Sequence, residues 1–310
     1  MAVKPAPTKW LLGPMAHDYQ SYNNCAANTT MMTISYFGLQ HTQYSVGELL
    51  RPNQSDVNVT PSEVMQFVKG QGLGAVVRLG GTPELVRRLV ANDIPVMLEH
   101  LLDAGGDIGH YSVVRGYDRA SDTFIVNDGN KGPMRYIPVS EYMRLWEPYQ
   151  RTYIPIYRPS QEVIVREILG PHWDAEYNPR EYAQEARSVV AARPSAEAWM
   201  NLGYALYLAG EYQAAVEAYY NAREYGISPH ALWYTAWPAA ALNRVERYSE
   251  ALSLTDSTLA EVPVSGEMLL ERGNALLGLG RSSEAARDFR LALQYSPSLW
   301  QAREALQRVR

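Results

Sequence analysis

The pattern of hydrophobic and polar positions divides this chain of 310 residues into two parts. Up to about residue 157, segments with helical periodicity alternate with short runs that have the composition of strands. After about residue 158 the pattern stays helical to the end. A chain of this length is long enough for two domains, so the change predicts an α+β domain followed by an all-α domain.

Helix signals in the first part are local and specific. Residues 25–38 have helical periodicity. Thr60, followed by Pro61 and Glu63, predicts a capping box with proline at the first helical position. Thr82 precedes another proline and predicts the start of a further helix.

Strand signals come between and after these helices. Four runs are typical of strands: residues 95–98, 111–117, 123–127 and 153–157. The second and third predict a hairpin, because the link 118–122 is polar. Pro155 predicts that the last run closes the sheet as an edge strand, since proline cannot donate a hydrogen bond to a neighbouring strand.

The hairpin spacing bears on two residues with useful chemistry, His110 and Asp128. A five-residue link would pair Tyr117 with Thr123, so that Ser112 faces Asp128 and His110 is its diagonal neighbour. Every pairing with an even sum of residue numbers puts His110 and Asp128 on one face of the sheet. The spacing therefore permits a contact, and the alternative is a surface histidine with an unrelated aspartate.

The helical part repeats itself. Gly203 and Gly273 open matching patterns and stand 70 residues apart, which is two periods of 34 plus two. The pattern resembles the tetratricopeptide repeat (TPR). It predicts three repeats over residues 196–297, of which the second departs by having Trp237 at the glycine position. A linker with a leading helix (159–195) would precede them and a capping helix (298–310) would follow; a generic helical bundle is the alternative.

Composition narrows the class of protein. The net charge of −5 argues against nucleic acid as a partner, and no apolar run reaches the ~18 residues of a membrane span. Residues 1–9 form a Pro-rich lead-in without the apolar core of a signal peptide. The sequence as it stands predicts a cytoplasmic protein, and a trimmed targeting segment would make it secreted or membrane-anchored.

The single cysteine, Cys25, is the main candidate for chemistry. It precedes a helical pattern, and a helix N-terminus stabilises a thiolate. His110 could exchange its proton, Asp128 could orient that histidine, and Gln20 could donate to an oxyanion. The order Gln, Cys, His, Asp is that of papain-like folds, while a small buried hydrophobic residue is the alternative for a lone cysteine.

A metal or cofactor is not predicted. One cysteine excludes an intrachain disulfide framework and a Cys-rich zinc site. A metal cluster could be drawn from His100, Asp103, Asp107 and His110, but their spacing fits no common site.

Three groups of residues together resemble the C39 peptidase family. They are the run with Leu12-Gly-Pro-Met15, Gln20, Asn24-Cys25 and Tyr36-Phe-Gly38, the run Gly109-His-Tyr through Gly116-Tyr-Asp118, and Val126-Asn-Asp128. The resemblance implies a papain-like α+β fold over residues 10–158, with Cys25 as nucleophile, His110 as base and Asp128 as its orienting group. It places Gln20 at the oxyanion hole.

The best-known members of that family remove leader peptides after a double glycine, within peptide exporters. This chain departs from the family pattern beside the site, with Ala26-Ala27 in place of Gly-Pro and Gly129 in place of Pro. The departures remove no catalytic group but put the double-glycine specificity in question.

The sequence thus predicts a papain-like cysteine peptidase domain followed by a TPR-like domain. Its substrate would be a peptide or protein, and the repeats would dock the substrate or a protein partner. Two alternatives stay open: a non-catalytic peptide-binding module on a peptidase fold, and a thiol acyltransferase or amidase.

Overall fold

The computed structural model of the chain describes residues 2–228 and 230–309 and forms two compact units. The first unit contains the residues up to Leu50 and Thr60–Asn178, and the second contains Arg51–Val59 and the residues from Pro179 onward. The domain boundary at residue 158 stays a prediction. The two compact units meet instead at Asn178 and Pro179 along the chain. Residues Ile164, Val165, Ile168 and Leu169, which were expected in a linker, pack into the core of the first unit.

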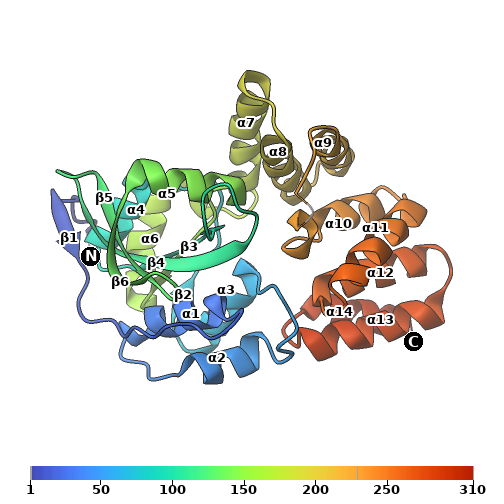
Figure 1. Cartoon of the computed structure of the whole chain (residues 1–310), viewed down its shortest axis with the longest axis horizontal. Coiled ribbons are helices and arrows are strands. Elements are labelled where there is room, and N and C mark those ends of the chain that lie inside the picture. The colour runs from blue at the N-terminus through green and yellow to red at the C-terminus, as the bar shows by residue number, and fades with distance from the viewer. Residues whose placement is uncertain (1, 229, 310) are drawn as a thin grey trace. The chain divides into compact units, whose positions relative to one another are not determined.

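The first unit is built on a seven-stranded sheet in which every recorded pairing is antiparallel (Figure 1). Its strands are β1 (Lys9–Leu11), β2 (Gly74–Ala75), β3 (Val96–Leu101), β4 (Gly109–Asp118), β5 (Thr123–Asp128), β6 (Gly132–Pro138) and β7 (Tyr153–Tyr157). The order is β2-β7-β3-β4-β5-β6, and β1 pairs with the second half of β4.

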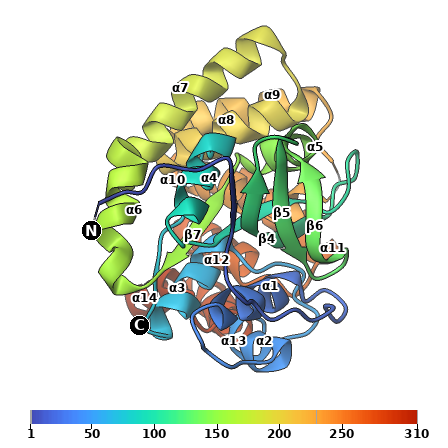
Figure 2. The same cartoon turned by 90° about the vertical axis from the view of Figure 1, so that its left-hand side faces the viewer.

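Helices cover both faces of this sheet (Figure 2). They are α1 (Cys25–Ser35), α2 (Gln43–Leu50), α3 (Pro61–Gly70), α4 (Pro83–Ala91), α5 (Val139–Trp146) and α6 (Glu162–Leu169). Residues of α4, α5 and α6 share one apolar core with Val96, Leu98 and Val114 of the sheet. On the opposite face lies α1, where Thr29 Oγ1 donates a hydrogen bond of 2.9 Å to the carbonyl oxygen of Tyr111.

The helix starts follow their sequence signals. Thr60 and Glu63 form the reciprocal hydrogen bonds of a capping box at α3, and Thr82 caps α4. Cys25 is the first residue of α1, as the periodicity predicted.

The predicted hairpin register is wrong at the turn and right at the site. Asp118 pairs with Thr123 and Tyr117 with Phe124, so the link is one residue shorter than expected. A register shift between Val114 and Gly116 then adds one residue to β4. This β-bulge restores the expected sum of residue numbers, and Ser112 faces Asp128 as predicted.

The prediction of an edge position for residues 153–157 is wrong. Strand β7 lies between β3 and β2, and Pro155 pairs with Val96 of β3. Proline is accommodated here because β2 is only two residues long and pairs with Ile156 and Tyr157, so the ladder on that side does not include Pro155.

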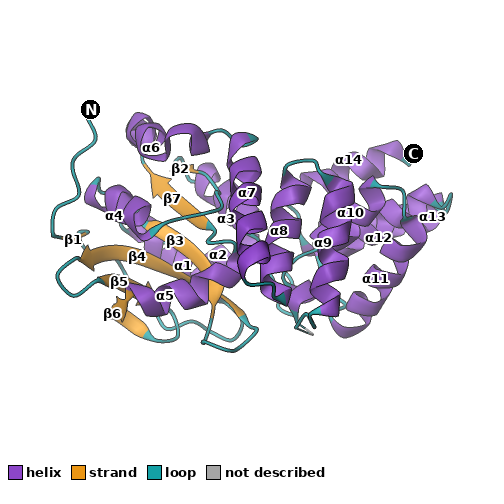
Figure 3. Ribbon diagram, turned by 90° about the horizontal axis from the view of Figure 1, so that it is seen from above, coloured by secondary structure: helices purple, strands orange, loops and turns teal. Residues whose placement is uncertain are grey.

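The second unit is helical, as Figure 3 shows by its colours. Its helices after the leading helix α7 (Tyr177–Ala192) are α8 (Ala196–Leu208), α9 (Tyr212–Glu224), α10 (Trp237–Arg244), α11 (Tyr248–Glu261), α12 (Gly266–Gly278), α13 (Ser282–Tyr295) and α14 (Trp300–Arg308). Among the described residues, none of the chain's helices has the length and apolarity that a membrane span requires.

Close contacts between rings and glycines explain the irregular second repeat. A Cβ atom on Gly203 would lie 2.2 Å from the ring of Trp237, and one on Gly273 would lie 2.4 Å from the ring of Phe289. Trp237, which replaces the expected glycine of the second repeat, is therefore the side chain that the first repeat's glycine accommodates. The fold class predicted from the sequence, α+β followed by helical repeats, is confirmed.

Candidate active site

Cys25 occupies the first position of α1 and is half-buried. The chain enters this helix through Asn23, whose φ of 56° lies in the left-handed region that asparagine tolerates. Asn24 is the N-cap residue, yet its side chain makes no capping hydrogen bond. The thiol therefore stands at a helix end where backbone N–H groups and the helix dipole favour negative charge.

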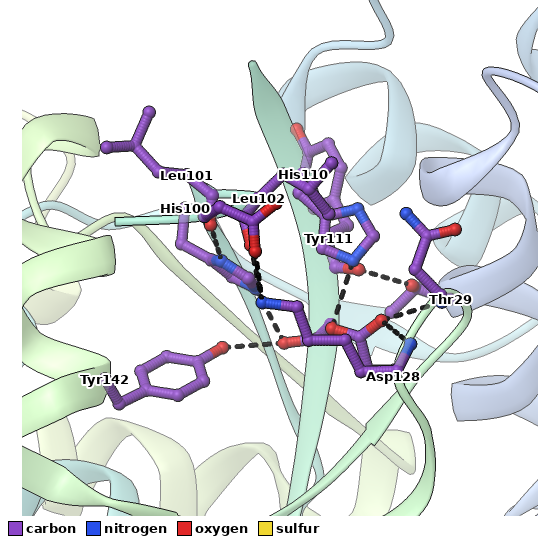
Figure 4. Close-up of polar contacts among 12 residues, drawn as sticks. Thr29, His100, Leu101, Leu102, His110, Tyr111, Asp128 and Tyr142 are labelled. Atoms are coloured by element: carbon purple, nitrogen blue, oxygen red, sulfur yellow. Dashed lines mark hydrogen bonds and ion pairs between the residues drawn. The ribbon is translucent and has the colours of Figure 1, made fainter. Parts of the chain in front are cut away.

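His110 and Asp128 form a buried pair, each 2% exposed. The Nε2 atom of His110 lies 3.1 Å from Oδ2 of Asp128 (Figure 4). Both side chains belong to the same sheet face, and Ser112 stands directly opposite Asp128. The diagonal contact that the strand spacing permitted is thus present.

Two backbone donors hold the other carboxylate oxygen of Asp128. Oδ1 accepts hydrogen bonds from the N–H groups of Asn130 at 2.7 Å and Lys131 at 2.9 Å. Burial by itself would raise the pKa of Asp128, but the hydrogen bond and charge of His110, with these two N–H groups, hold it well below its usual range. The carboxylate is therefore ionised at neutral pH.

The imidazole of His110 has two acidic neighbours. Burial alone would lower its pKa, but hydrogen bonds to Asp128 and to the side chain of Cys25, together with their charges, raise the pKa of His110 to about 9. The structure thus brings the three residues together, with His110 between Cys25 and Asp128. Since Asp128 engages Nε2, the nitrogen left for Cys25 is Nδ1.

Gln20 lies beside the turn that follows Asp128. Its N–H donates a hydrogen bond of 2.9 Å to the carbonyl oxygen of Gly129. A Cβ atom on Gly129 would lie 2.5 Å from Oδ1 of Asn28 and 3.0 Å from Oε1 of Gln20. The side chains of Asn28 and Gln20 thus leave no room for a Cβ atom at position 129, which explains why this residue is glycine.

His100, whose spacing from the neighbouring acidic residues fits no common metal site, lies beside His110. The ring centroids of His100 and His110 lie 5.3 Å apart, in an edge-to-face arrangement. Nδ1 of His100 lies 2.6 Å from the carbonyl oxygen of Leu101, which can only accept, so Nδ1 carries the proton. Nε2 then accepts from Ser112 Oγ at 2.8 Å, and that hydroxyl accepts from Tyr142 at 2.7 Å.

Burial keeps His100 neutral, against the hydrogen bond to Leu101, which by itself would favour the charged form. Burial, reinforced by the charge of His110, lowers the pKa of His100 to about 3. A positive His110 therefore has an uncharged neighbour. The pairing of His100 with His110 across β3 and β4 is the signal that could have revealed this contact, but it depends on strand order, which the sequence does not show.

Donor atoms of His100, His110 and Asp128 lie within 4.8 Å of one another, which is the spacing of a metal site. The hydrogen bonds described above already engage both nitrogens of His100 and both oxygens of Asp128. Asp103, another member of the metal cluster considered from the sequence, forms an ion pair with Lys131 at 3.0 Å. The donor atoms of the two histidines and Asp128 belong to two separate sets of hydrogen bonds, His110 with Asp128 and His100 with Ser112, which meet only through the contact of the two imidazole rings.

His17 also contacts the site. Its Nε2 lies 3.0 Å from the backbone carbonyl oxygen of Asp128. Its ring packs against that of Tyr19, with the two ring centroids 5.1 Å apart.

Comparisons with known proteins agree with this architecture. Residues 10–154 match the model of the Peptidase_C39 like family, and residues 180–231 and 239–299 match that of the tetratricopeptide repeat. The sequence matches no curated protein.

Several solved structures are similar at low identity. A double glycine motif protease from an AMS/PCAT transporter, crystallised with the leader peptide, is 16% identical and covers 48% of this chain and 94% of its own, with a TM-score of 0.38. The peptidase domain of Streptococcus ComA is 16% identical, covers 46% and 98%, and has a TM-score of 0.38. MamA from Desulfovibrio magneticus RS-1 is 19% identical, covers 43% and 74%, and has a TM-score of 0.37. From the family matches, the chain contains a Peptidase_C39-like domain over residues 10–154, followed by tetratricopeptide repeats over residues 180–231 and 239–299.

Proposed function

We propose that this protein is a cysteine peptidase that hydrolyses peptide bonds of a peptide or protein substrate. The observation that carries the proposal is the buried His110–Asp128 pair next to Cys25 at the N-terminus of α1. The match of residues 10–154 to the Peptidase_C39 like family supports it.

Each group would have a defined task in the reaction. The sulfur of Cys25 attacks the substrate carbonyl carbon, and His110 accepts the proton of the thiol. The carbonyl oxygen becomes an oxyanion, which the side-chain amide of Gln20 and the N–H groups at the start of α1 stabilise. His110 then gives its proton to the leaving amine. Water, deprotonated by His110, hydrolyses the resulting thioester and regenerates the thiol.

Asp128 would act through His110. A carboxylate that stays ionised fixes the imidazole ring in one orientation and stabilises the imidazolium that forms during the reaction. The backbone donors on Oδ1 keep Asp128 from rotating away from His110.

The helical repeats would dock the substrate or a protein partner. Arrays of such repeats present extended surfaces for binding peptides and proteins, and residues 180–231 and 239–299 match the tetratricopeptide repeat.

The test is cleavage of a defined peptide mixture by the full chain and by its Cys25→Ala variant. The mixture includes peptides with a double glycine, since the resemblance makes these the first sequences to examine, and mass spectrometry identifies the new termini. We expect cleavage by the native chain and none by the variant. Cleavage that survives in Cys25→Ala would contradict the proposal.

A second arm separates hydrolysis from acyl transfer. The same reaction is run with added glycinamide, a small amine that can replace water as the acceptor. We expect free carboxyl termini to predominate. Products that carry glycinamide in place of a free carboxylate would identify an acyltransferase instead.

A further inference from the structure

One buried glutamine binds the chain segment that leads into Cys25. Gln43, the first residue of α2, is 2% exposed. Its side-chain amide makes four hydrogen bonds to the segment Asp18–Asn24. Oε1 accepts from Ser21 N–H at 2.8 Å and from Asn24 Nδ2 at 3.0 Å. Nε2 donates to Asp18 Oδ2 at 2.6 Å and to the carbonyl oxygen of Tyr19 at 2.9 Å.

These four contacts fix the orientation of the Gln43 amide. A glutamine side chain has two donor hydrogens and two acceptor positions, and here all four are used. A rotation of the amide by 180° would put its oxygen against the carboxylate of Asp18 and the carbonyl of Tyr19, and its NH₂ group against the N–H of Ser21. Every contact would become repulsive, so only the observed orientation is compatible with its neighbours.

The anchored segment carries Gln20. Gln43 binds the backbone of both neighbours of Gln20, the carbonyl oxygen of Tyr19 and the N–H of Ser21. The N–H of Gln20 itself is bound to Gly129, beside Asp128. The backbone around Gln20 is therefore held from α2 on one side and from the end of β5 on the other.

Gln43 also engages the residue that would otherwise cap α1. An asparagine at an N-cap normally accepts a hydrogen bond from an N–H group of the first helical turn. Asn24 makes no such bond. Its Nδ2 donates instead to Oε1 of Gln43 and, at 3.3 Å, to the backbone carbonyl oxygen of Gln43. Its Oδ1 lies on the α2 side, 3.2 Å from the place that a Cβ on Gly47 would take. The side chain of Asn24 thus leaves the N–H groups at the start of α1 uncovered.

We propose that Gln43 is a positioning residue that preorganises both oxyanion donors, the side chain of Gln20 and the N-terminus of α1. The inference rests on the proposed function, since it assigns a task within that reaction. Gln43 touches neither the thiol nor the substrate, and it acts by fixing the segment that supplies these donors.

The experiment compares two reactions of the only cysteine in the chain. Acylation by p-nitrophenyl acetate passes through a tetrahedral oxyanion, because the sulfur adds to the ester carbonyl before p-nitrophenolate leaves. Alkylation by iodoacetamide is a direct displacement of iodide and forms no oxyanion. The ratio of the two rates therefore reports oxyanion stabilisation separately from the reactivity of the thiol.

Gln43→Met keeps the side-chain length and removes all four hydrogen bonds. We expect it to lower the acylation rate by about 10- to 100-fold while the alkylation rate changes by less than about twofold. Gln43→Glu keeps the two acceptors and removes the two donors, so it gives an independent reading if the methionine variant does not fold. Adding Asp18→Asn to Gln43→Glu restores one donor–acceptor pair and should recover part of the acylation rate.

A matched control is Gln161→Met. The Gln161 amide accepts from Arg158 N–H at 2.9 Å and donates to the carbonyl oxygen of Asn92 at 3.2 Å, so it ties backbone in the same unit without touching the segment before Cys25. We expect Gln161→Met to lower thermal stability and leave the acylation-to-alkylation ratio unchanged. An unchanged ratio in the Gln43 variants, or an equal change in Gln161→Met, would overturn the inference.

The same assay distinguishes the two proposals. Acylation that persists in Cys25→Ala would count against the proposed peptidase chemistry itself. Acylation that requires Cys25 but ignores Gln43 would leave that chemistry standing and remove only the role of Gln43.

Discussion

Each unit of the molecule contains a buried carboxylate held by a cation, and the two cations differ in chemistry. Asp128 in the sheet lies against the imidazole of His110. Asp288 in α13 is 1% exposed and accepts two hydrogen bonds from the guanidinium of Arg272, at 2.6 and 3.0 Å. Arginine keeps its proton throughout the pH range in which proteins fold, whereas histidine gains and loses one near neutrality. The pair in the repeats is therefore a permanent structural tie, and the pair in the sheet is suited to proton transfer.

Replacing the two carboxylates by their amides should separate these roles most clearly. Asp128→Asn should lower the turnover of p-nitrophenyl acetate by about 10³- to 10⁴-fold, because an amide neither stabilises the imidazolium nor selects the same ring tautomer. Asp288→Asn should leave turnover unchanged and lower thermal stability. Steady-state kinetics and calorimetry of both variants provide the measurement. Native turnover in Asp128→Asn would contradict the distinct role of the His110–Asp128 pair.

In the first unit, Gln20→Ala should have the next largest effect on turnover. The loss of one oxyanion donor lowers turnover by about 10²- to 10³-fold in comparable sites. Among residues 2–228 and 230–309, Oε1 of Gln20 has no hydrogen-bond partner, so the melting temperature should change little. Native turnover in a folded Gln20→Ala protein would show that another group stabilises the oxyanion.

Arg272→Met tests the structural tie in the repeats. It leaves the carboxylate of Asp288 buried without its cation, and we expect the free energy of unfolding to fall by about 1–3 kcal/mol. The guanidinium is partly exposed, so the loss should stay below that of a fully buried pair. Arg281→Met is the control, since its ion pair with Glu284 is exposed on both sides and should contribute little. Equal losses in chemical denaturation would contradict the distinction between the two pairs.

The pH dependence of stability should show the smallest effect. The pKa of His110 is raised from 6.5 to about 9, so its contribution is complete below pH 6.5 and is lost as the pH rises through about 9. The pKa of Asp128 is lowered from 3.8, so its contribution is present above that value and is lost as the pH falls through the lowered pKa. The stability difference between the native chain and Asp128→Asn should therefore be largest between about pH 4 and 6.5.

Calorimetry of both proteins across this range, with Asp288→Asn as reference, provides the measurement. A difference that grew above pH 9 would have the wrong sign for a raised His110 pKa.

The features that the sequence predicted depend on neighbours in the chain. The capping box at Thr60 and the start of α1 at Cys25 are local. Period-two alternation predicted His110 and Asp128 on one face, and this holds because the β-bulge in β4 restores the even register. The roles of Cys25, His110, Asp128 and Gln20 stay predictions.

What the sequence could not show depends on contacts between distant segments. The position of β7 inside the sheet is decided by the short strand β2, which has only two residues and no distinct pattern. The hydrogen bonds from His100 to Ser112 and from Ser112 to Tyr142 require β3 to pair with β4 and α5 to cover them. The four contacts of Gln43 span about 20 residues, and nothing in the composition of that stretch marks the glutamine as an anchor.

The β-bulge in β4 separates the length of the hairpin tip from the geometry of the site. Between the bulge and the turn the strands pair in one register, and beyond the bulge, toward His110, they pair in another. The outer register is held by β1, which pairs with Gly116–Asp118, and by the ion pairs of Arg119 with Glu84 and of Asp122 with Arg87. One extra residue in β4 thus uncouples the two ends of the hairpin, so that a four-residue link at one end is compatible with Ser112 opposite Asp128 at the other.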